Sequence, residues 1–405
     1  MKLYRLSNRE ELYGIMLFVS YTIFAIFDFP GWRSIVSCLF ILPVIFYWDD
    51  REFRKIVFSF PMLLWLGLTL YQYLNGIHKQ VPEVNYIDLL HGFKVYSCIL
   101  IFAYWASRDF ERTVSILVKA YFIRCVIVLA YLSAGGVGDR LTGAGGSATG
   151  LGQFAAILGI FIAYLNAVRY VSFDKNVFLS GIPLLIIFLT QSRNPMAMFG
   201  MSLLISYYAY TKYRGGNVTL KFILFLLVGL VGIYALMPML EDTAFAERVM
   251  TAQDRLEESY VYKTYATGTI FDAIVGDRLV YYVLGFEFFK SSPITGIGVW
   301  NYRFLTGGTY PLHSEYMVHL CEGGIIAAAL WLLFHFSMIR IIRRIKFNKT
   351  LKWIAAGSLF ILLFCGIYAR EFFYEFFHPV YGLILALGII NKRVLNGEDH
   401  ELAVD

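Results

Sequence analysis

The residues best suited to chemistry in this chain are four arginines and one histidine. Arg140, Arg193, Arg278 and Arg370 fall in or beside connections between apolar stretches, and His313 stands at the start of another such stretch. A guanidinium stays protonated at any relevant pH, and its planar fork binds phosphate oxygens through paired hydrogen bonds. A histidine can hydrogen-bond or deprotonate a hydroxyl near neutral pH. This combination predicts a site for an anionic, phosphate-bearing ligand beside a general base.

Arg193 occupies the most constrained of these positions. The polar stretch Thr190–Asn194 separates two apolar segments with almost no loop, and Pro195 opens the second segment. Proline suits the first turn of a helix, where free N–H groups and the helix dipole attract anions. We therefore expect Arg193 and this helix start to face the same ligand. A snorkelling or salt-bridged arginine is the structural alternative, here and at the other three positions.

Three cationic positions are weaker candidates. Arg140 lies in the glycine-dense stretch 135–146, which could wrap backbone amides around a ligand but lacks the GxxxxGK[ST] pattern and also fits a flexible loop. Lys119 and Arg124 lie inside an apolar stretch, where a charge is costly unless it faces a cavity or a partner. Arg124, near the middle, is the stronger functional candidate. A buried ion pair is its structural alternative.

The other histidines near the same predicted side carry less weight. His319 follows His313 by six residues and points to a different helix face, so the two do not form a metal pair. His378 is flanked by Phe376 and Phe377, a pattern typical of an interfacial aromatic belt. His313 itself could instead anchor the start of a helix at the membrane surface.

The composition indicates which elements must position these residues. Of 405 residues, 58% are hydrophobic and only 16% charged, with a mean hydropathy of +0.61. Soluble chains carry about 25% charged residues, so a cytosolic enzyme is disfavoured. The five cysteines sit in or beside apolar runs without CxxC spacing and are expected to act as small hydrophobes. The net charge of +6 is divided into short groups between apolar segments, which indicates membrane topology and no nucleic-acid partner.

We predict an all-α integral membrane protein that forms a single polytopic domain, residues 1–405. A helix needs about 20 apolar residues to cross the hydrocarbon core. Twelve stretches qualify: 11–30, 32–48, 56–74, 87–106, 113–133, 151–168, 176–191, 195–211, 221–239, 314–339, 352–369 and 374–391. Clusters of Lys and Arg between them place both termini on the cytoplasmic side. The long connection 240–313 then forms an external loop subdomain, expected to contain short helices packed over the outer mouth of the bundle.

Several enzyme classes lack their sequence signatures. The chain contains no DxD pair, HExxH, Walker or GxSxG motif. A soluble-type metal-dependent transferase, a metalloprotease and an ATPase are therefore unsupported, and no metal or cofactor is expected. Arginines and a histidine at the outer mouth suit a lipid diphosphate donor better than a nucleotide.

Four pieces, in a fixed order along the chain, resemble a known group. They are Asp139-Arg140-Leu141-Thr142-Gly143, Thr190-Gln191-Ser192-Arg193, the stretch from Gly276-Asp277-Arg278 to Pro293-Ile294-Thr295-Gly296-Ile297-Gly298, and His313-Ser314 followed after nine residues by Gly324. With the twelve predicted spans and the one long loop, they resemble the O-antigen ligase and O-antigen polymerase superfamily of bacterial membrane glycosyltransferases. Ala327 departs from the ligase pattern, which usually has Gly, Thr or Tyr there.

This resemblance implies a GT-C-like bundle that transfers a glycan from undecaprenyl diphosphate, without metal and with inversion, on the periplasmic face of the bacterial inner membrane. Arg193 and Arg278 would hold the diphosphate, and His313 would orient or deprotonate the acceptor hydroxyl. Arg140, Arg124 and Ser314 would add contacts to the substrates. The implied partners are the lipid-linked oligosaccharide donor, a glycan or lipid A-core acceptor, membrane lipids and a chain-length regulator.

The sequence leaves several functions open. A polymerase would use another lipid-linked glycan as acceptor, whereas a ligase would use lipid A-core; we favour the polymerase. An anion or solute transporter is an alternative of another class, because charges inside the bundle could line a path for anions. A noncatalytic scaffold of the polysaccharide machinery is a third.

Overall fold

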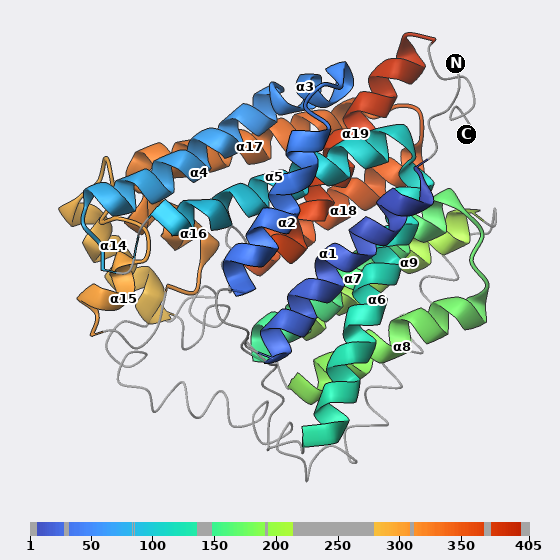
Figure 1. Cartoon of the computed structure of the whole chain (residues 1–405), viewed down its shortest axis with the longest axis horizontal. Coiled ribbons are helices and arrows are strands. Elements are labelled where there is room, and N and C mark those ends of the chain that lie inside the picture. Colours follow the sequence, from blue (N-terminus) through green and yellow to red (C-terminus); the bar gives the residue numbers. More distant parts are fainter. Residues whose placement is uncertain are drawn as a thin grey trace.

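The computed structural model describes residues 6–27, 32–82, 84, 86–135, 148–190, 193–213, 279–307, 312–367 and 374–397. Helices and turns account for these residues, and no strand occurs among them (Figure 1). The predicted all-α class is therefore confirmed.

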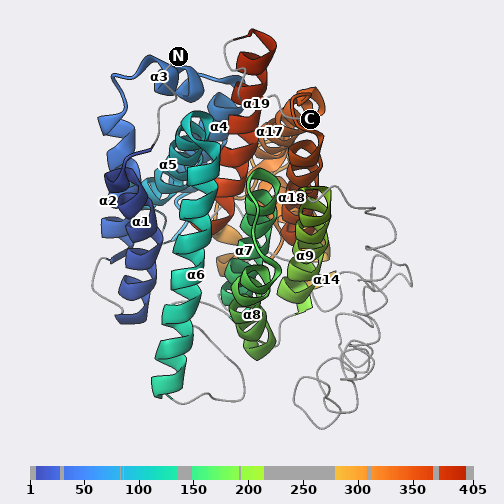
Figure 2. The ribbon, with the colours of Figure 1, turned by 90° about the vertical axis from the view of Figure 1, so that its right-hand side faces the viewer.

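Long helices run side by side from the end that carries α3 to the opposite end of the bundle (Figure 2). The first half contains α1 (Asn8–Phe27), α2 (Trp32–Phe46), α3 (Arg51–Val57), α4 (Phe60–His78), α5 (Tyr86–Arg108), α6 (Phe110–Gly135), α7 (Ala148–Val168), α8 (Phe173–Thr190) and α9 (Arg193–Tyr213). The second contains α14 (Leu279–Ser291), α15 (Asn301–Leu305), α16 (Glu315–Met317), the π-helix η2 (Val318–Glu322), α17 (Gly324–Arg344), α18 (Lys349–Gly366), the 3₁₀ turn η4 (Glu375–Phe377) and α19 (His378–Leu395). The core lies where α5 packs along α19 and α2, and where α7 packs against α8 and α9.

Five of the described helices are long and apolar enough to cross a membrane: α5, α6, α7, α17 and α18. A sixth span results if α3 and α4, which meet at 57°, are counted as one broken span. α2 is apolar but shorter, with Pro43 inside it. The protein is thus a multi-pass helical membrane protein. The count of twelve stays a prediction, because the span 221–239 and the loop residues 240–278 lie outside the described residues.

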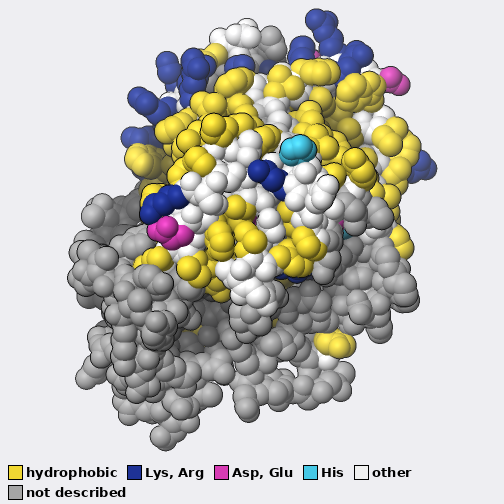
Figure 3. Space-filling view, turned by 90° about the vertical axis from the view of Figure 1, so that its left-hand side faces the viewer, with side chains coloured by type: hydrophobic (Ala, Val, Ile, Leu, Met, Phe, Trp, Pro, Cys, Tyr) yellow, Lys and Arg dark blue, Asp and Glu magenta, His cyan; other side chains and the backbone are white. Residues whose placement is uncertain are grey.

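One face of α17 is strongly apolar and uncovered. Ile325, Leu332, Leu333 and Phe336 are between 46% and 61% exposed along this helix. Such side chains are unfavourable in water and are suited to acyl chains. Figure 3 shows apolar side chains over much of one face of the molecule, with Lys and Arg gathered at its upper end and a few charged side chains and a histidine nearer the middle. Both surfaces are those expected of a bilayer-embedded bundle.

The first and last described residues lie at the same end of the bundle. Leu6 accepts a hydrogen bond from Arg112 and donates its amide to Asp109 at 3.3 Å, while Arg393 of α19 donates to the Ser107 carbonyl oxygen at 2.7 Å. All three contacts converge on the α5–α6 turn. This arrangement agrees with the prediction that both ends share one side of the membrane, and which side that is stays a prediction.

The cysteines behave as expected. Cys98, Cys125, Cys321 and Cys365 are buried and Cys38 is exposed, and all five are free thiols. They serve as small apolar side chains in helix contacts.

Candidate active site at the outer end of the bundle

Residues 293–298 and residues 321–326 pair with each other through backbone hydrogen bonds. We call this pairing the glycine clasp. The Ile297 amide donates to the Cys321 carbonyl at 3.0 Å, and the Gly298 amide donates to that of Glu322 at 2.9 Å. In the other direction, the Ile325 amide donates to the Pro293 carbonyl at 2.9 Å. The clasp fixes the end of the predicted external loop to the start of α17.

The clasp requires glycine at both of its central positions. Gly296 has φ +71° and Gly324 has φ +67°, conformations that side chains other than glycine rarely adopt. A Cβ on Gly296 would lie 2.4 Å from the Glu322 carbonyl oxygen, and one on Gly324 would lie 2.3 Å from that of Ile294. Gly296 of the Pro-x-x-Gly stretch and Gly324, which is separated from Ser314 by nine residues, are therefore two sides of one contact.

Helix α4 supports the clasp from the bundle side. The Asn75 side-chain amide donates to the Thr295 carbonyl at 2.6 Å, and the Tyr71 hydroxyl donates to the same oxygen at 3.3 Å. Asn75 also reaches the Glu322 carbonyl at 3.4 Å. Polar side chains on an apolar helix are thus used to satisfy the backbone oxygens of an irregular segment.

A buried hydrogen-bonded chain runs through the π-helix η2. His319 Nε2 lies 2.7 Å from a Glu315 carboxylate oxygen, and its Nδ1 lies 2.9 Å from the Gln72 side-chain nitrogen. An amide nitrogen only donates, so Nδ1 accepts and Nε2 carries the proton that Glu315 accepts. Both ionisable side chains are 1–2% exposed, and the imidazole stacks on Trp331 with centroids 5.6 Å apart.

The sequence indicated only that His319 does not form a metal-binding pair with His313. The signal that would have found its partner is the four-residue spacing from Glu315, which puts both on one helix face. π-helical turns are rare and often mark functional sites. Here η2 lies between the His313–Ser314 turn and the clasp.

The turn that carries His313 is held on both sides. His313 is half-buried, and its ring meets that of Tyr281 edge-on at 5.6 Å. Ser314 is fully buried, caps α16 by accepting from the Met317 amide, and donates its hydroxyl to Tyr282 at 3.0 Å. The Tyr282 hydroxyl in turn donates to the Ile367 carbonyl at 3.0 Å. Ser314 thus fixes the backbone next to His313.

Two short helices from the predicted loop cover this turn. The Tyr302 ring of α15 packs edge-on against Phe288 and Tyr281 of α14, with centroids 5.8 and 6.1 Å apart. Burial raises the pKa of the Tyr302 hydroxyl, and the neighbouring Tyr281, Cys321 and Glu322 raise it further. Tyr302 therefore stays neutral at any physiological pH. Loop residues 240–278 and 308–311 lie outside the described residues.

Helix α9 starts at Arg193, two residues before the predicted start at Pro195. Asn194 directs its side-chain amide to the Cys365 sulfur at 3.8 Å, and Pro195 is pressed against Gly152 of α7, where a Cβ would lie 2.8 Å from the proline ring. The side chain of Arg193 is outside the described part of the chain.

Both turns approach the same element, the last turn of α18. Cys365 receives Asn194 from the Ser-Arg turn and the Gln153 amide at 3.2 Å. Gly366 faces Glu315, whose Cβ would lie 3.2 Å from a Cβ on that glycine. The structure therefore brings the start of α9 and the His313 turn to one end of one helix. Arg140, Arg278 and Arg370 lie outside the described residues.

Arg124 is buried on aromatic rings. Its side chain is 7% exposed, and its guanidinium carbon lies 3.9 Å from the Phe154 ring centroid and 4.6 Å from that of Tyr21. Nε and Nη1 have no hydrogen-bond partner among the described residues. Lys119, by contrast, is half-exposed and paired with Glu11 at 2.5 Å. Lys119 is therefore ion-paired without being buried, whereas Arg124 keeps hydrogen-bonding capacity.

Next to Arg124 lies a buried ion pair that sequence reasoning missed. The Lys94 ammonium of α5 is 3.0 Å from the Glu375 carboxylate of η4, with side chains 8% and 1% exposed. Arg124 also interacts electrostatically with Glu375. Two positive charges thus share one negative charge in the interior.

The predicted aromatic belt around His378 is wrong. Phe376, Phe377 and His378 are all buried, because η4 turns inward against α5 and α7. The His378 ring packs edge-on against Trp65 at 5.3 Å, and its Nδ1 bonds the Tyr374 carbonyl at 2.7 Å. Apolar sequence alone does not distinguish an aromatic residue facing lipid from one facing a neighbouring helix.

No group of three or more His, Cys, Asp or Glu side chains that could hold a metal ion occurs among the described residues. The polar groups that gather at this end are instead a histidine–carboxylate pair, a buried lysine–carboxylate pair and an aromatic-bound guanidinium. Their chemistry is that of hydrogen bonding and of charge stabilisation.

These features define a multi-pass helical membrane protein with a buried polar centre near one end and an irregular, glycine-dependent segment above it. The sequence model of one family, described as O-antigen ligase, matches residues 178–332. This match, which covers less than half of the chain, confirms the resemblance of the motifs to the O-antigen ligase and polymerase superfamily. No curated protein matches the chain.

The matched region covers the features just described. It includes Arg193, the glycine clasp, His313 and the His319–Glu315 pair, and it ends just beyond Trp331. Lys94, Arg124 and Glu375 lie outside it.

Proposed function

We propose that this protein transfers a lipid-diphosphate-linked glycan to the hydroxyl of an acceptor glycan at the outer end of the bundle, as a surface-polysaccharide polymerase. The observation that carries the proposal is the convergence of the Ser-Arg turn and the His313 turn on the last turn of α18. One turn starts a helix with an arginine, which suits a diphosphate, and the other holds a half-buried histidine, which suits a hydroxyl.

In the proposed reaction, His313 accepts the proton of the acceptor hydroxyl as its oxygen bonds the anomeric carbon of the donor. The bond from that carbon to the phosphate oxygen breaks, and its electron pair leaves with the lipid diphosphate. Arg193 and Arg278 bind the diphosphate and stabilise the charge that develops on it. Attack from the face opposite the leaving group inverts the anomeric centre. Arg140 supplies a further phosphate contact.

Ser314 and Arg124 take more limited roles in this proposal. The buried Ser314 hydroxyl holds the His313 backbone in place through Tyr282. Arg124 adds positive potential from the interior of the bundle, and its Nε and Nη1 can still donate hydrogen bonds. No metal or cofactor takes part.

The test is glycan transfer by purified protein with a lipid-diphosphate oligosaccharide as donor. H313A is expected to lower turnover by roughly 10²–10⁴-fold, the usual contribution of a general base. R193A and R278A are each expected to lower it about 10²-fold or more. Matched controls are H78A, a histidine at the end of α4, and K290A, an exposed lysine of α14. Transfer by H313A at the rate of H78A would refute the proposed base.

Correct folding of each variant is checked by its elution volume and melting temperature. A variant that melts like wild type yet transfers no glycan has lost chemistry. The transporter alternative is separated by the same set, because it predicts that H313A is silent and that a neutral residue at Arg124 stops flux.

A ligase is the second candidate, and the match to a family described as O-antigen ligase is compatible with either activity. The two are separated by the acceptor. A strain lacking the polymerase places single repeats on lipid A-core, whereas a strain lacking the ligase leaves long chains on the lipid carrier. The outcome for a deletion of this gene assigns the chain to one or the other.

A further inference from the structure

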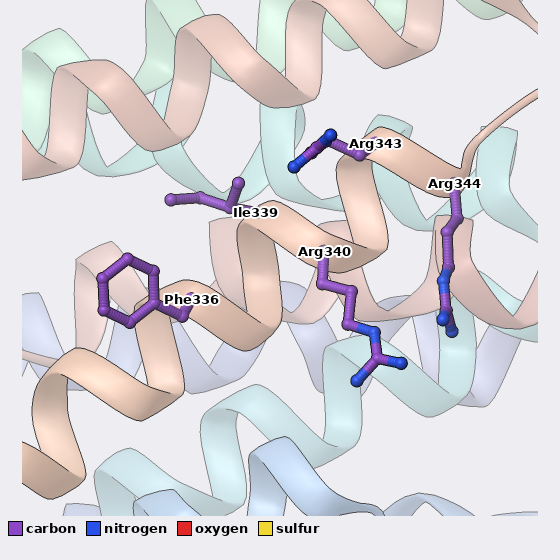
Figure 4. A pocket seen from close by; sticks show the side chains of 5 residues that line it. All are labelled: Phe336, Ile339, Arg340, Arg343 and Arg344. Carbon is purple, nitrogen blue, oxygen red and sulfur yellow. The ribbon is translucent and has the colours of Figure 1, made fainter.

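The end of α17 away from the clasp carries three exposed arginines in two turns. Arg340, Arg343 and Arg344 are exposed, and none pairs with a carboxylate among the described residues. Arg340 and Arg344 extend to the same side of the helix, and Arg343 extends to the other (Figure 4). Lys352 of α18 adds another cation nearby, since its ammonium donates to the Arg343 carbonyl at 3.1 Å.

These arginines line an open groove together with two apolar side chains. The groove has a volume of about 560 Å³ and is lined by Phe336, Ile339, Arg340, Arg343 and Arg344. Phe336 is 61% exposed and Ile339 37%. The groove is thus apolar toward the middle of the helix and cationic toward its end.

Apolar side chains precede the arginines along α17. Phe336 stands four residues, about 6 Å along the helix axis, before Arg340, and the exposed Leu332 and Leu333 continue the apolar surface toward the middle. An acyl chain lying along this apolar face places its phosphate at the level of the guanidiniums. Guanidiniums bind phosphate oxygens in pairs.

We propose that this groove binds the headgroup of an anionic glycerophospholipid, with its phosphate on Arg340 and Arg344 and an acyl chain along Phe336. Arg343, on the other side of the helix, adds positive charge. Charge selects the lipid. The uncompensated cations attract a headgroup of net negative charge, whereas the ammonium of a zwitterionic headgroup meets like charge. The site lies at the far end of α17 from the His313 turn and does not depend on the proposed reaction.

The experiment measures which lipid stays bound to the purified full-length chain. Wild type in detergent is mixed with equal amounts of phosphatidylglycerol and phosphatidylcholine, and the retained lipids are counted by native mass spectrometry. We expect phosphatidylglycerol to be preferred about tenfold. The variant R340Q/R343Q/R344Q is expected to lose the preference. Equal retention of the two lipids by wild type would overturn the proposal.

A matched variant separates a site from overall charge. R51Q/R54Q/K392Q removes the same charge from exposed residues of α3 and α19 at the same end of the bundle, and it is expected to keep the preference. Loss of preference in both variants would show that only total charge matters. Inorganic phosphate at matched concentration provides a second check, because displacement of the lipid by phosphate alone would indicate a simple anion site.

Discussion

At the scale of single residues, the glycine clasp gives the family's spaced motifs a physical meaning. Gly296 and Gly324 must be glycine for the same reason. At each position a Cβ would collide with backbone atoms of the opposite stretch. His313 is linked to this contact through α16 and η2, which occupy the residues between Ser314 and Gly323. The nine-residue spacing between Ser314 and Gly324 is therefore set by the position at which Gly324 pairs with residues 293–298.

The clasp predicts a large and position-specific loss of stability. G296A adds the strain of a left-handed backbone, about 1–3 kcal/mol, and places its Cβ only 2.4 Å from backbone atoms of Glu322, a clash that only a chain shift can relieve. G307A has φ +90° but meets nothing within 4 Å, so it adds only the strain, about 1–2 kcal/mol. Thermal unfolding in detergent should rank G296A well below G307A. Equal melting temperatures of G296A and G307A would mean that the close backbone contact at Gly296 does not contribute to stability.

The buried charges predict an unequal pair of variants. E375Q leaves Lys94 and Arg124 without their carboxylate, whereas K94M leaves Glu375 still facing Arg124. Breaking a buried ion pair costs about 3–5 kcal/mol, and more charge is left uncompensated in E375Q. Unfolding measurements should therefore show E375Q to be the less stable of the two. A K94M variant that is equally or less stable would contradict this order.

At the scale of elements, hydropathy located most helices but not their irregularities. Long apolar runs predicted α5, α6, α7, α17 and α18, because backbone groups in a bilayer must be satisfied within the helix. The 57° bend between α3 and α4 and the π-helix η2 were not predicted, since both depend on tertiary contacts.

The same limit applies to the site. The Ser-Arg helix start was predicted from its proline, and His313 from its position at the start of an apolar run. The Lys94–Glu375 pair and the partner of His319 were not, because nothing local to Lys94 or Gln72 indicates which distant residue they meet. Burial of the aromatic residues around His378 was missed for the same reason.

Because Asp50 caps helix α3, we expect the stability of the protein to depend on pH. Asp50 caps this helix by accepting from the Glu52 and Phe53 amides, and it also accepts from the Tyr104 hydroxyl at 2.6 Å and from Arg108. Burial raises the pKa of Asp50, but these hydrogen bonds and the Arg108 charge lower it by more, so its pKa lies below the ordinary value.

Because the folded-state pKa is depressed, the contribution of Asp50 is complete above its ordinary pKa of about 4 and is lost as the pH falls through the folded-state value. Melting temperatures of wild type and D50N should therefore differ most near neutral pH and converge in acid. A difference that is constant with pH would show that the Asp50 charge contributes nothing.

At the scale of the whole molecule, the two ends of the bundle are expected to face different compartments. In a background without native cysteines, K290C on α14 should react with an impermeant maleimide in intact cells, whereas R344C on α17 should react only after permeabilisation. Both positions are exposed in the structure, so access is set by the membrane. Labelling of R344C in intact cells would reverse the predicted orientation.

The Lys94–Glu375 pair also constrains how the protein is made. α5 leaves the ribosome long before η4 and α19, so Lys94 enters the bilayer before its carboxylate exists. A lone cation inside a membrane is costly, so we expect α5 to reach its final depth only after η4 has inserted. Chains that terminate early therefore carry an uncompensated lysine, a feature by which quality-control proteases can distinguish unfinished copies from complete ones.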